Sequence, residues 1–218
     1  MLRLSGEDAG ELLLVRHAEA ALSRSHDPML TCCGLEQAER LALRLSATWF
    51  AAVYSAPERR AQQTARVLAG ASGRAVHVLD GLADVEFDGE RASAELPFDY
   101  TARFMEVPPW DSLPGFERSK SFRRRAVQTI ERVLSISQAS RVVMVSHSSV
   151  INAYVSMLLS IPADQFITLE PTSVSVVRWR AGRYAVRCLN DLSHLSPGCG
   201  FPTQRQLFTP RSLPLTTR

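Results

Sequence analysis

The sequence has few of the features that mark membrane, secreted or zinc-binding proteins. Its 218 residues include four cysteines, at positions 32, 33, 188 and 199, and no two of them form a Cys-x-x-Cys pair. This absence argues against a structural zinc site and a thioredoxin-like motif. Adjacent cysteines rarely bridge each other, so we expect free thiols in a reducing compartment. No apolar run approaches the length of a transmembrane helix, and two acids precede any long apolar stretch. We therefore expect a cytoplasmic protein without a membrane partner.

The chain also lacks a strong charge of either sign. The formal net charge is +3, which is too small to indicate nucleic-acid binding. Three adjacent arginines, Arg123 to Arg125, point in different directions if they lie on a helix, so we predict no nucleic-acid partner. Apolar residues make up 45% and charged residues 22%, which is typical of a soluble domain with a sizeable core.

Short apolar runs alternate with helical spacings along most of the chain. Strands are predicted over residues 11–15, 50–54, 75–79, 141–145, 173–179 and 184–189, the last two joined by a turn at Ala181-Gly182. Helices are predicted over 34–47, 57–69, 121–136 and 148–159, with Pro57 in a first helical turn. This alternation predicts an α/β fold, a three-layer α/β/α sandwich with a mostly parallel central sheet.

Two stretches have no clean period. Residues 81–120 mix four prolines with six aromatic residues, which is typical of a long functional loop, and we interpret them as a cap or insertion. Residues 196–218 are rich in proline and are predicted to form an extended or poorly ordered tail. We therefore predict a single domain over residues 1–195, followed by this tail, which could pack on a second copy in a homodimer.

Two histidines directly follow predicted strands. His17 comes after the first strand, beside Arg16, and His147 comes after the strand at 141–145. A lone histidine at a strand end is usually a satisfied polar residue, but ligands of parallel sheets bind where such ends meet. Arg60 enters the helix after the second strand and could point back at the same edge, although most helix arginines simply face water.

These residue types suit the transfer of a phosphoryl group. That group carries negative charge on several oxygens, and arginine binds two of them at once through its planar fork. The N–H groups of Ser148 and Ser149 would open a helix, where an anion is favoured. A neutral imidazole, with an ordinary pKa of about 6.5, can attack phosphorus at cellular pH. No metal or other cofactor is required, because the arginines and a second imidazole balance the charge.

Four segments resemble the signature of the histidine phosphatase superfamily, in its phosphoglycerate-mutase-like branch. Arg16-His17-Ala18 and the stretch from Pro28 to Ala38 are similar to the family pattern R-H-G followed by P-L-T-x-x-G-x-x-Q-A. Residues 54–65 are similar to Y-S-S-P-x-x-R-A-x-x-T-A, and residues 145–148 to V-S-H-G. The chain departs from the pattern at Ala18 and Ser148, where the family has glycine.

The resemblance implies roles for the matching residues. His17 would form a phosphohistidine, and Arg16, Arg60 and His147 would hold the phosphoryl oxygens. The general acid of the family lies in a pattern like L-x-E-x-x-F-G. Alignment on Leu82 and Phe87 puts Asp84 at the acid's position, with Glu86 as the alternative.

Two further positions are predicted to bind substrate. Many members of the family have an asparagine that contacts phosphate where this chain has residues 23–26, so Ser23 or His26 could replace it. The anion preference of a helix start also makes Ser148 a predicted substrate-binding residue.

The resemblance further implies a metal-independent phosphatase of the histidine acid type that hydrolyses a small phosphomonoester. The chain lacks the Trp-rich stretch of phosphoglycerate mutases after the first motif, so mutase-type phosphoryl transfer is the alternative. A second alternative is a binding module for phosphorylated ligands that has weak catalysis, since Asp84 replaces the usual glutamate. The sequence does not identify the physiological substrate.

Overall fold

The computed structural model describes residues 9–21, 27–85, 117–137, 141–163, 165–180 and 182–195. Its strands are β1 (Ala9–Arg16), β2 (Ala52–Ser55), β3 (Val76–Val78), β4 (Arg141–Ser146), β5 (Val174–Arg180) and β6 (Arg183–Asp191). Its helices are α1 (Cys32–Leu45), α2 (Arg59–Ser72), α3 (Ser119–Ile136) and α4 (Ser148–Leu159), with a short 3-10 turn, η1 (Asp80–Leu82). None of these helices is both long and apolar enough to cross a membrane.

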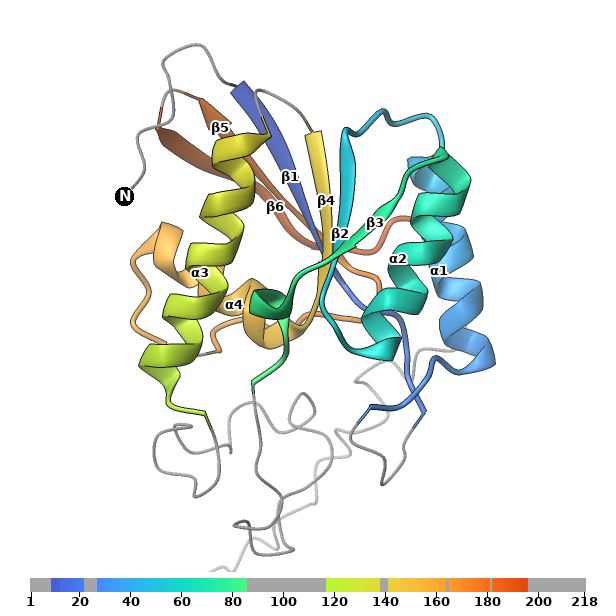
Figure 1. Ribbon diagram of the computed structural model, residues 1–218, viewed down its shortest axis with the longest axis horizontal. Helices are drawn as coiled ribbons and strands as arrows, with labels where there is room; N and C mark the ends of the chain where they lie inside the picture. Colours follow the sequence, from blue (N-terminus) through green and yellow to red (C-terminus); the bar gives the residue numbers. More distant parts are fainter. Residues whose placement is uncertain are drawn as a thin grey trace, which may run out of the picture.

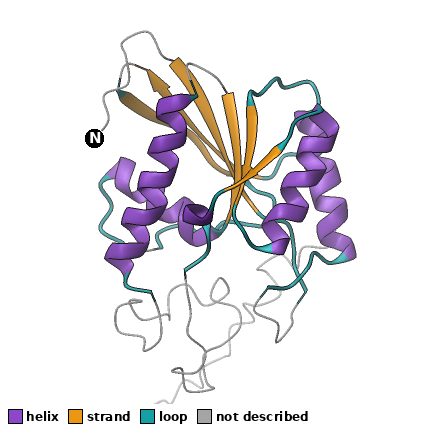
Figure 2. Cartoon of the chain, viewed as in Figure 1, coloured by secondary structure: helices purple, strands orange, loops and turns teal. Residues whose placement is uncertain are grey.

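The strands form one sheet in the order β3-β2-β4-β1-β5-β6 (Figure 1). The first four strands of this order are parallel, and β5 and β6 extend the sheet in antiparallel fashion. Helices α1 and α2 cover one face, and α3 and α4 cover the other (Figure 2). The structure therefore confirms the predicted three-layer sandwich with a mostly parallel sheet.

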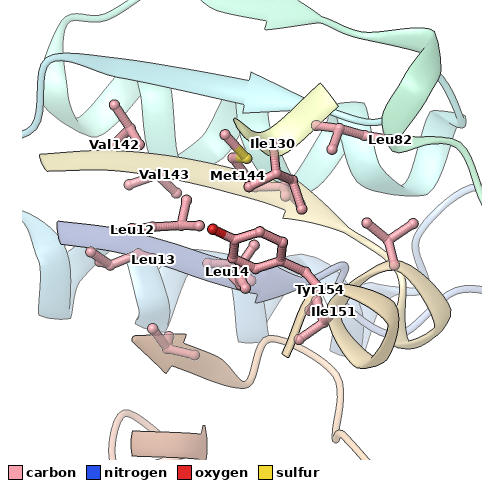
Figure 3. Packing of buried hydrophobic residues seen from close by; sticks show 14 of the residues in the cluster. Leu12, Leu13, Leu14, Leu82, Ile130, Val142, Val143, Met144, Ile151 and Tyr154 are labelled. Atoms are coloured by element: carbon pink, nitrogen blue, oxygen red, sulfur yellow. The ribbon is translucent and has the colours of Figure 1, made fainter. Parts of the chain in front are cut away.

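The central strands β1 and β4 are buried on both faces. Leu12 to Val15 are at most 4% exposed, and Val142 to Val145 are fully buried. A strand covered by helices on both sides needs apolar residues at successive positions, which explains the unbroken apolar runs. Figure 3 shows Tyr154 and Ile151 of α4 packed against these strands, beside Ile130 of α3. This core holds the ends of β1 and β4 in fixed positions.

Three of the four predicted helix starts, at residues 34, 57 and 121, differ by two residues from those of the structure, and the start at Pro57 is the one closest to the site. We expected Pro57 in the first turn, but α2 begins at Arg59 after an extended Glu58 with φ −67° and ψ 144°. The N–H of Ala56 donates to the Val145 carbonyl at 2.9 Å, which continues the pairing beyond β2. The turn into the helix therefore needs Pro57 and Glu58 as connecting residues.

Other predictions concern the hairpin, the thiols and the poorly patterned stretches. Arg180 pairs with Arg183, as the predicted turn requires, and Gly182 adopts φ 73°. Cys32, Cys33 and Cys188 are free thiols, as expected. The predicted tail and most of the predicted cap, residues 86–116, lie outside the described residues. Those two predictions stay untested.

Gly34 allows the segment after β1 to pack closely on α1. A Cβ at Gly34 would lie 2.0 Å from the Glu19 carbonyl oxygen, which is backbone and cannot rotate away. Thr31 caps the same helix end by accepting from the Gly34 N–H at 2.9 Å, and its hydroxyl donates to Glu19 at 2.7 Å. This close packing fixes the backbone at Glu19, two residues after His17.

We predict that Gly34→Ala lowers the free energy of unfolding by about 1–3 kcal/mol, as overpacking of a close contact does. Gly70→Ala in α2 is the matched control, because a Cβ there meets nothing within 4 Å. It should raise stability by about 0.5–1 kcal/mol, the helix preference for alanine. Urea unfolding of both variants checks this, and a neutral Gly34→Ala would contradict the packing described.

Candidate active site

His17 and His147 follow neighbouring parallel strands at one edge of the sheet. Arg16 at the end of β1 pairs in register with Ser146 at the end of β4. The His17 N–H donates to the Ser146 carbonyl at 2.8 Å, so the pairing reaches the residue after the strand. The two imidazole rings lie edge to face, with centroids 5.1 Å apart. The predicted meeting of both histidines at one edge is confirmed.

The hydrogen bonds of His17 determine which ring nitrogen is available. Nδ1 lies 2.7 Å from the Ala18 carbonyl oxygen, which can only accept, so Nδ1 carries the proton. Nε2 then holds a lone pair and accepts from Arg60 Nε at 3.3 Å. Burial lowers the pKa of His17 well below its ordinary value, and the charges of His147, Arg16 and Arg60 lower it further. The ring is therefore neutral at cellular pH, with Nε2 facing the site.

Arg60 is the second residue of α2, and its guanidinium reaches back to the sheet edge. It is 12% exposed. Besides His17, it contacts His147 Nδ1 at 3.3 Å and donates to the Asp84 carboxylate at 3.1 Å. Arg60 thus lies among three of the predicted site residues, as the sequence predicted. Arg59, its neighbour, is exposed and contacts Met29 instead.

His147 is held from behind by Glu58, which the sequence argument did not identify. His147 is 1% exposed, and its Nε2 lies 2.7 Å from the Glu58 carboxylate. Because a carboxylate accepts, His147 donates there and turns Nδ1 toward Asp84 and Arg60. The same carboxylate accepts from the Asp84 N–H at 2.9 Å. Burial alone would raise the pKa of Glu58, but the hydrogen bond and charge of His147 bring it below its usual value.

Asp84 follows η1 and enters the site as the sequence predicted. Its carboxylate lies 3.1 Å from Arg60 and 3.3 Å from His147 Nδ1, and it accepts from the Ser149 hydroxyl at 2.5 Å. Burial would raise the pKa of Asp84, but His147, Arg60 and the Ser149 hydrogen bond hold it well below its usual range. The carboxylate is therefore ionised and lies against the cationic side chains of the site.

The other predicted site residues are Arg16, Ser148, Ser23, His26 and Glu86. The Arg16 guanidinium donates to the Leu169 carbonyl, and its charge lies close enough to lower the pKa of His17. The Ser148 hydroxyl lies against Asn152 within α4, so Ser149 supplies the side-chain contact with Asp84. Ser23, His26 and Glu86 lie outside the described residues, so their predicted roles stay untested.

The geometry supports attack by nitrogen on an electrophile that carries negative charge. The neutral His17 ring turns its Nε2 lone pair toward the Arg60 guanidinium, and the His147 imidazole lies edge to face beside it. The Asp84 carboxylate contacts both Arg60 and His147. An anion that displaced Asp84 from Arg60 would gain a charge-assisted hydrogen bond. Phosphate esters combine this charge with an electrophilic centre.

Comparison with known proteins gives a family match over most of the chain. Residues 12–192 match the model of the histidine phosphatase superfamily, branch 1. Phosphoserine phosphatase 1 of Hydrogenobacter thermophilus is 29% identical over 199 residues, which span 85% of this chain and 94% of that protein. A probable phosphoglycerate mutase of an Enterobacter species is 25% identical over 203 residues, with the same coverage.

A solved structure supports the same relationship. The putative alpha-ribazole-5′-P phosphatase of Escherichia coli superposes with a TM-score of 0.70 and is 25% identical in sequence. The superposition covers 85% of this chain and 98% of the solved chain. The two chains therefore share a similar architecture over most of their lengths.

The low pKa of His17 predicts a loss of stability in acid. Between pH 7 and 5 the unfolded chain protonates its histidines near pH 6.5, whereas folded His17 stays neutral. The unfolded state then binds more protons, so the free energy of unfolding falls as pH falls. His17→Asn should flatten this slope by at most about 1.4 kcal/mol per pH unit.

Urea unfolding at several pH values measures these slopes. His77→Asn, at an exposed position in β3, is the matched control for the loss of an imidazole. A His17→Asn slope equal to that of the unmodified protein would show that His17 is not held neutral.

Proposed function

The chain belongs to the histidine phosphatase superfamily, branch 1, and we propose that it hydrolyses a phosphomonoester through a phosphohistidine on His17, without a metal. The observation that carries the proposal is the hydrogen bond from His17 Nδ1 to the Ala18 carbonyl. It leaves the lone pair on Nε2, among groups that bind anions. The names of phosphatase relatives support hydrolysis of a small metabolite, and phosphoserine is a reasonable first substrate to test.

In the first step, Nε2 of His17 attacks phosphorus, and the bond from phosphorus to the ester oxygen breaks. The phosphoryl group passes to nitrogen, and the leaving oxygen takes a proton from Asp84. Arg16, Arg60 and His147 hold the phosphoryl oxygens and stabilise the charge that develops on them. These side chains supply the positive charge that a metal ion provides in other phosphoryl-transfer enzymes.

Asp84 must be protonated to act as an acid, although it is ionised in the phosphate-free site. The change follows from competition for the same cations. When a phosphate ester occupies the site, Arg60 and His147 turn to its oxygens, and a second negative charge lies beside Asp84. Loss of cationic partners and the approach of a like charge both raise the pKa of a carboxyl group. Binding of the substrate therefore favours the protonated form of Asp84, which can then donate to the leaving oxygen.

In the second step, water attacks the phosphohistidine. Ionised Asp84 accepts a proton from the water, the bond from phosphorus to Nε2 breaks, and inorganic phosphate leaves with His17 restored. The low pKa of His17 keeps the ring unprotonated below pH 6.5, so turnover extends into the acid range. This expected pH dependence supports the proposal of a histidine phosphatase of the acid type. Within the described residues, no structural observation specifically favours mutase-type transfer or a binding module with weak catalysis.

We predict that the enzyme releases inorganic phosphate from p-nitrophenyl phosphate at an unchanged rate in the presence of EDTA. His17→Ala should lower kcat by on the order of 10³-fold or more, because only binding and electrostatic effects remain without the nucleophile. His77→Ala is the control histidine variant. Full activity in His17→Ala, or a loss in EDTA that magnesium reverses, would refute the proposal.

A second prediction identifies the acid. Asp84→Asn should lower kcat for phosphoserine by about 10²- to 10⁴-fold, because an alkoxide needs a proton to leave. The same variant should lose far less with p-nitrophenyl phosphate in a pre-steady-state burst, since nitrophenolate leaves unprotonated. Glu86→Gln is compared in parallel. If Glu86→Gln shows this dependence on the leaving group and Asp84→Asn does not, then Glu86 is the acid.

A further inference from the structure

We propose that His194, acting through Thr172, is a positioning residue that fixes the backbone of Arg16 and His17 for attack. This inference rests on the proposed function of His17 as the nucleophile. Neither residue touches the reacting atoms, so the proposed effect is on the orientation of the His17 imidazole. The contacts that carry it join the end of β1 to the segment that follows β6.

The loop at residues 169–173 encloses the peptide backbone of the nucleophile. The Thr172 N–H donates to the carbonyls of Arg16 at 3.1 Å and His17 at 3.3 Å. In return, the Arg16 N–H donates to the Ser173 carbonyl at 3.1 Å. The Leu169 carbonyl accepts from the Arg16 guanidinium. The loop thus holds both the main chain and the side chain of Arg16, and it holds the carbonyl of His17.

Thr172 makes these contacts from a backbone conformation that its residue type rarely adopts. Its φ is 59°, in the left-handed region, and it is fully buried. Branching at Cβ makes this region unfavourable for threonine, so surrounding contacts must hold the residue there. Strained residues of this kind cluster at functional sites. The strain here lies one hydrogen bond from the nucleophile.

The side chain of Thr172 shows what holds it. Its hydroxyl donates to the Pro171 carbonyl at 2.7 Å, which uses its one proton. The contact of 2.9 Å between this hydroxyl and His194 Nε2 must then have His194 as the donor. Nδ1 of His194 is left without a proton, and Arg44 Nη1 lies 3.5 Å from it. Burial and the charge of Arg44 lower the pKa of His194 to about 4, which matches a neutral ring.

The segment that carries His194 is itself fixed at two further points. Asp191 accepts from Arg44 at the end of α1 at 2.5 Å. The Asn190 side chain accepts from the Glu170 N–H at 2.8 Å, inside the same loop. The chain after β6 therefore holds the loop at Glu170 and at Thr172. This segment thereby sets the direction of the Cα–Cβ bond of His17, and with it the orientation of Nε2.

Kinetics with phosphoserine and p-nitrophenyl phosphate test the proposal. His194→Ala and Thr172→Ala should each lower kcat by about 10- to 100-fold, since a misplacement of about 1 Å can cost 10²-fold. KM should change little, because the groups that bind phosphate remain. His194→Gln, whose amide can donate to the hydroxyl, and Thr172→Ser, which keeps the hydroxyl, should recover most of kcat. His77→Ala is the control.

A double-mutant cycle separates positioning from general destabilisation. If both residues act through one hydrogen bond, His194→Ala with Thr172→Ala should lose no more kcat than one single variant. All rates are measured at a temperature where urea unfolding shows each variant folded. Additive losses, losses in KM alone, or no recovery in Thr172→Ser and His194→Gln would overturn the proposal.

Hydrogen exchange keeps this test independent of the proposed function. The Thr172 amide should exchange roughly tenfold faster or more in folded His194→Ala, because the local opening energy falls when a holding contact is lost. If the unmodified protein hydrolyses no phosphomonoester, the proposed function fails, and the exchange rate alone decides whether His194 holds the loop. Unchanged exchange at Thr172 would refute it in either case.

Discussion

The parallel register of β1 and β4 is the constraint on which the site depends. Arg16 lies opposite Ser146, so the residues that follow both strands reach the same level of the sheet edge. His17 and His147 therefore meet, although they lie 130 positions apart in the sequence. The His17 N–H donates to the Ser146 carbonyl beyond the last strand pair, and close packing on both faces opposes a shift of register, because a shift would move each buried side chain into a space shaped for another. The core thereby fixes the distance between the two imidazoles.

The second constraint is electrostatic. Arg60 and His147 are largely buried beside the neutral imidazole of His17, and burial of charge is costly unless an opposite charge lies nearby. In the phosphate-free protein, Asp84 supplies this charge to both, while Glu58 accepts from His147 on its other side. A phosphate ester can replace Asp84 as the partner of these cations. The contacts of Asp84 with Arg60 and His147 thus link substrate binding to the protonation of the acid.

The fold and the main site residues could be predicted from the sequence because their signals are local. Apolar runs predict buried strands, and His17, His147 and Arg60 lie at fixed distances from strand ends. Glu58 gave no such signal, since an acid at a helix start is usually explained by the helix dipole. Ser148 and Ser149 differ by about 100° around the helix, so only the packed structure distinguishes their contacts. The link from His194 to Thr172 depends on tertiary placement and on a backbone angle that no residue pattern indicates.

The identity of the phosphorylated nitrogen tests the central claim most directly. Asp84→Asn mixed with p-nitrophenyl phosphate should accumulate the phosphoenzyme, because the leaving group needs no acid while hydrolysis lacks its base. Phosphorus NMR of the alkali-denatured protein distinguishes the two isomers of phosphohistidine. The hydrogen bond from Nδ1 to Ala18 predicts phosphorus on Nε2 of His17. Phosphorus on Nδ1, on another residue, or on no residue at all would contradict the account.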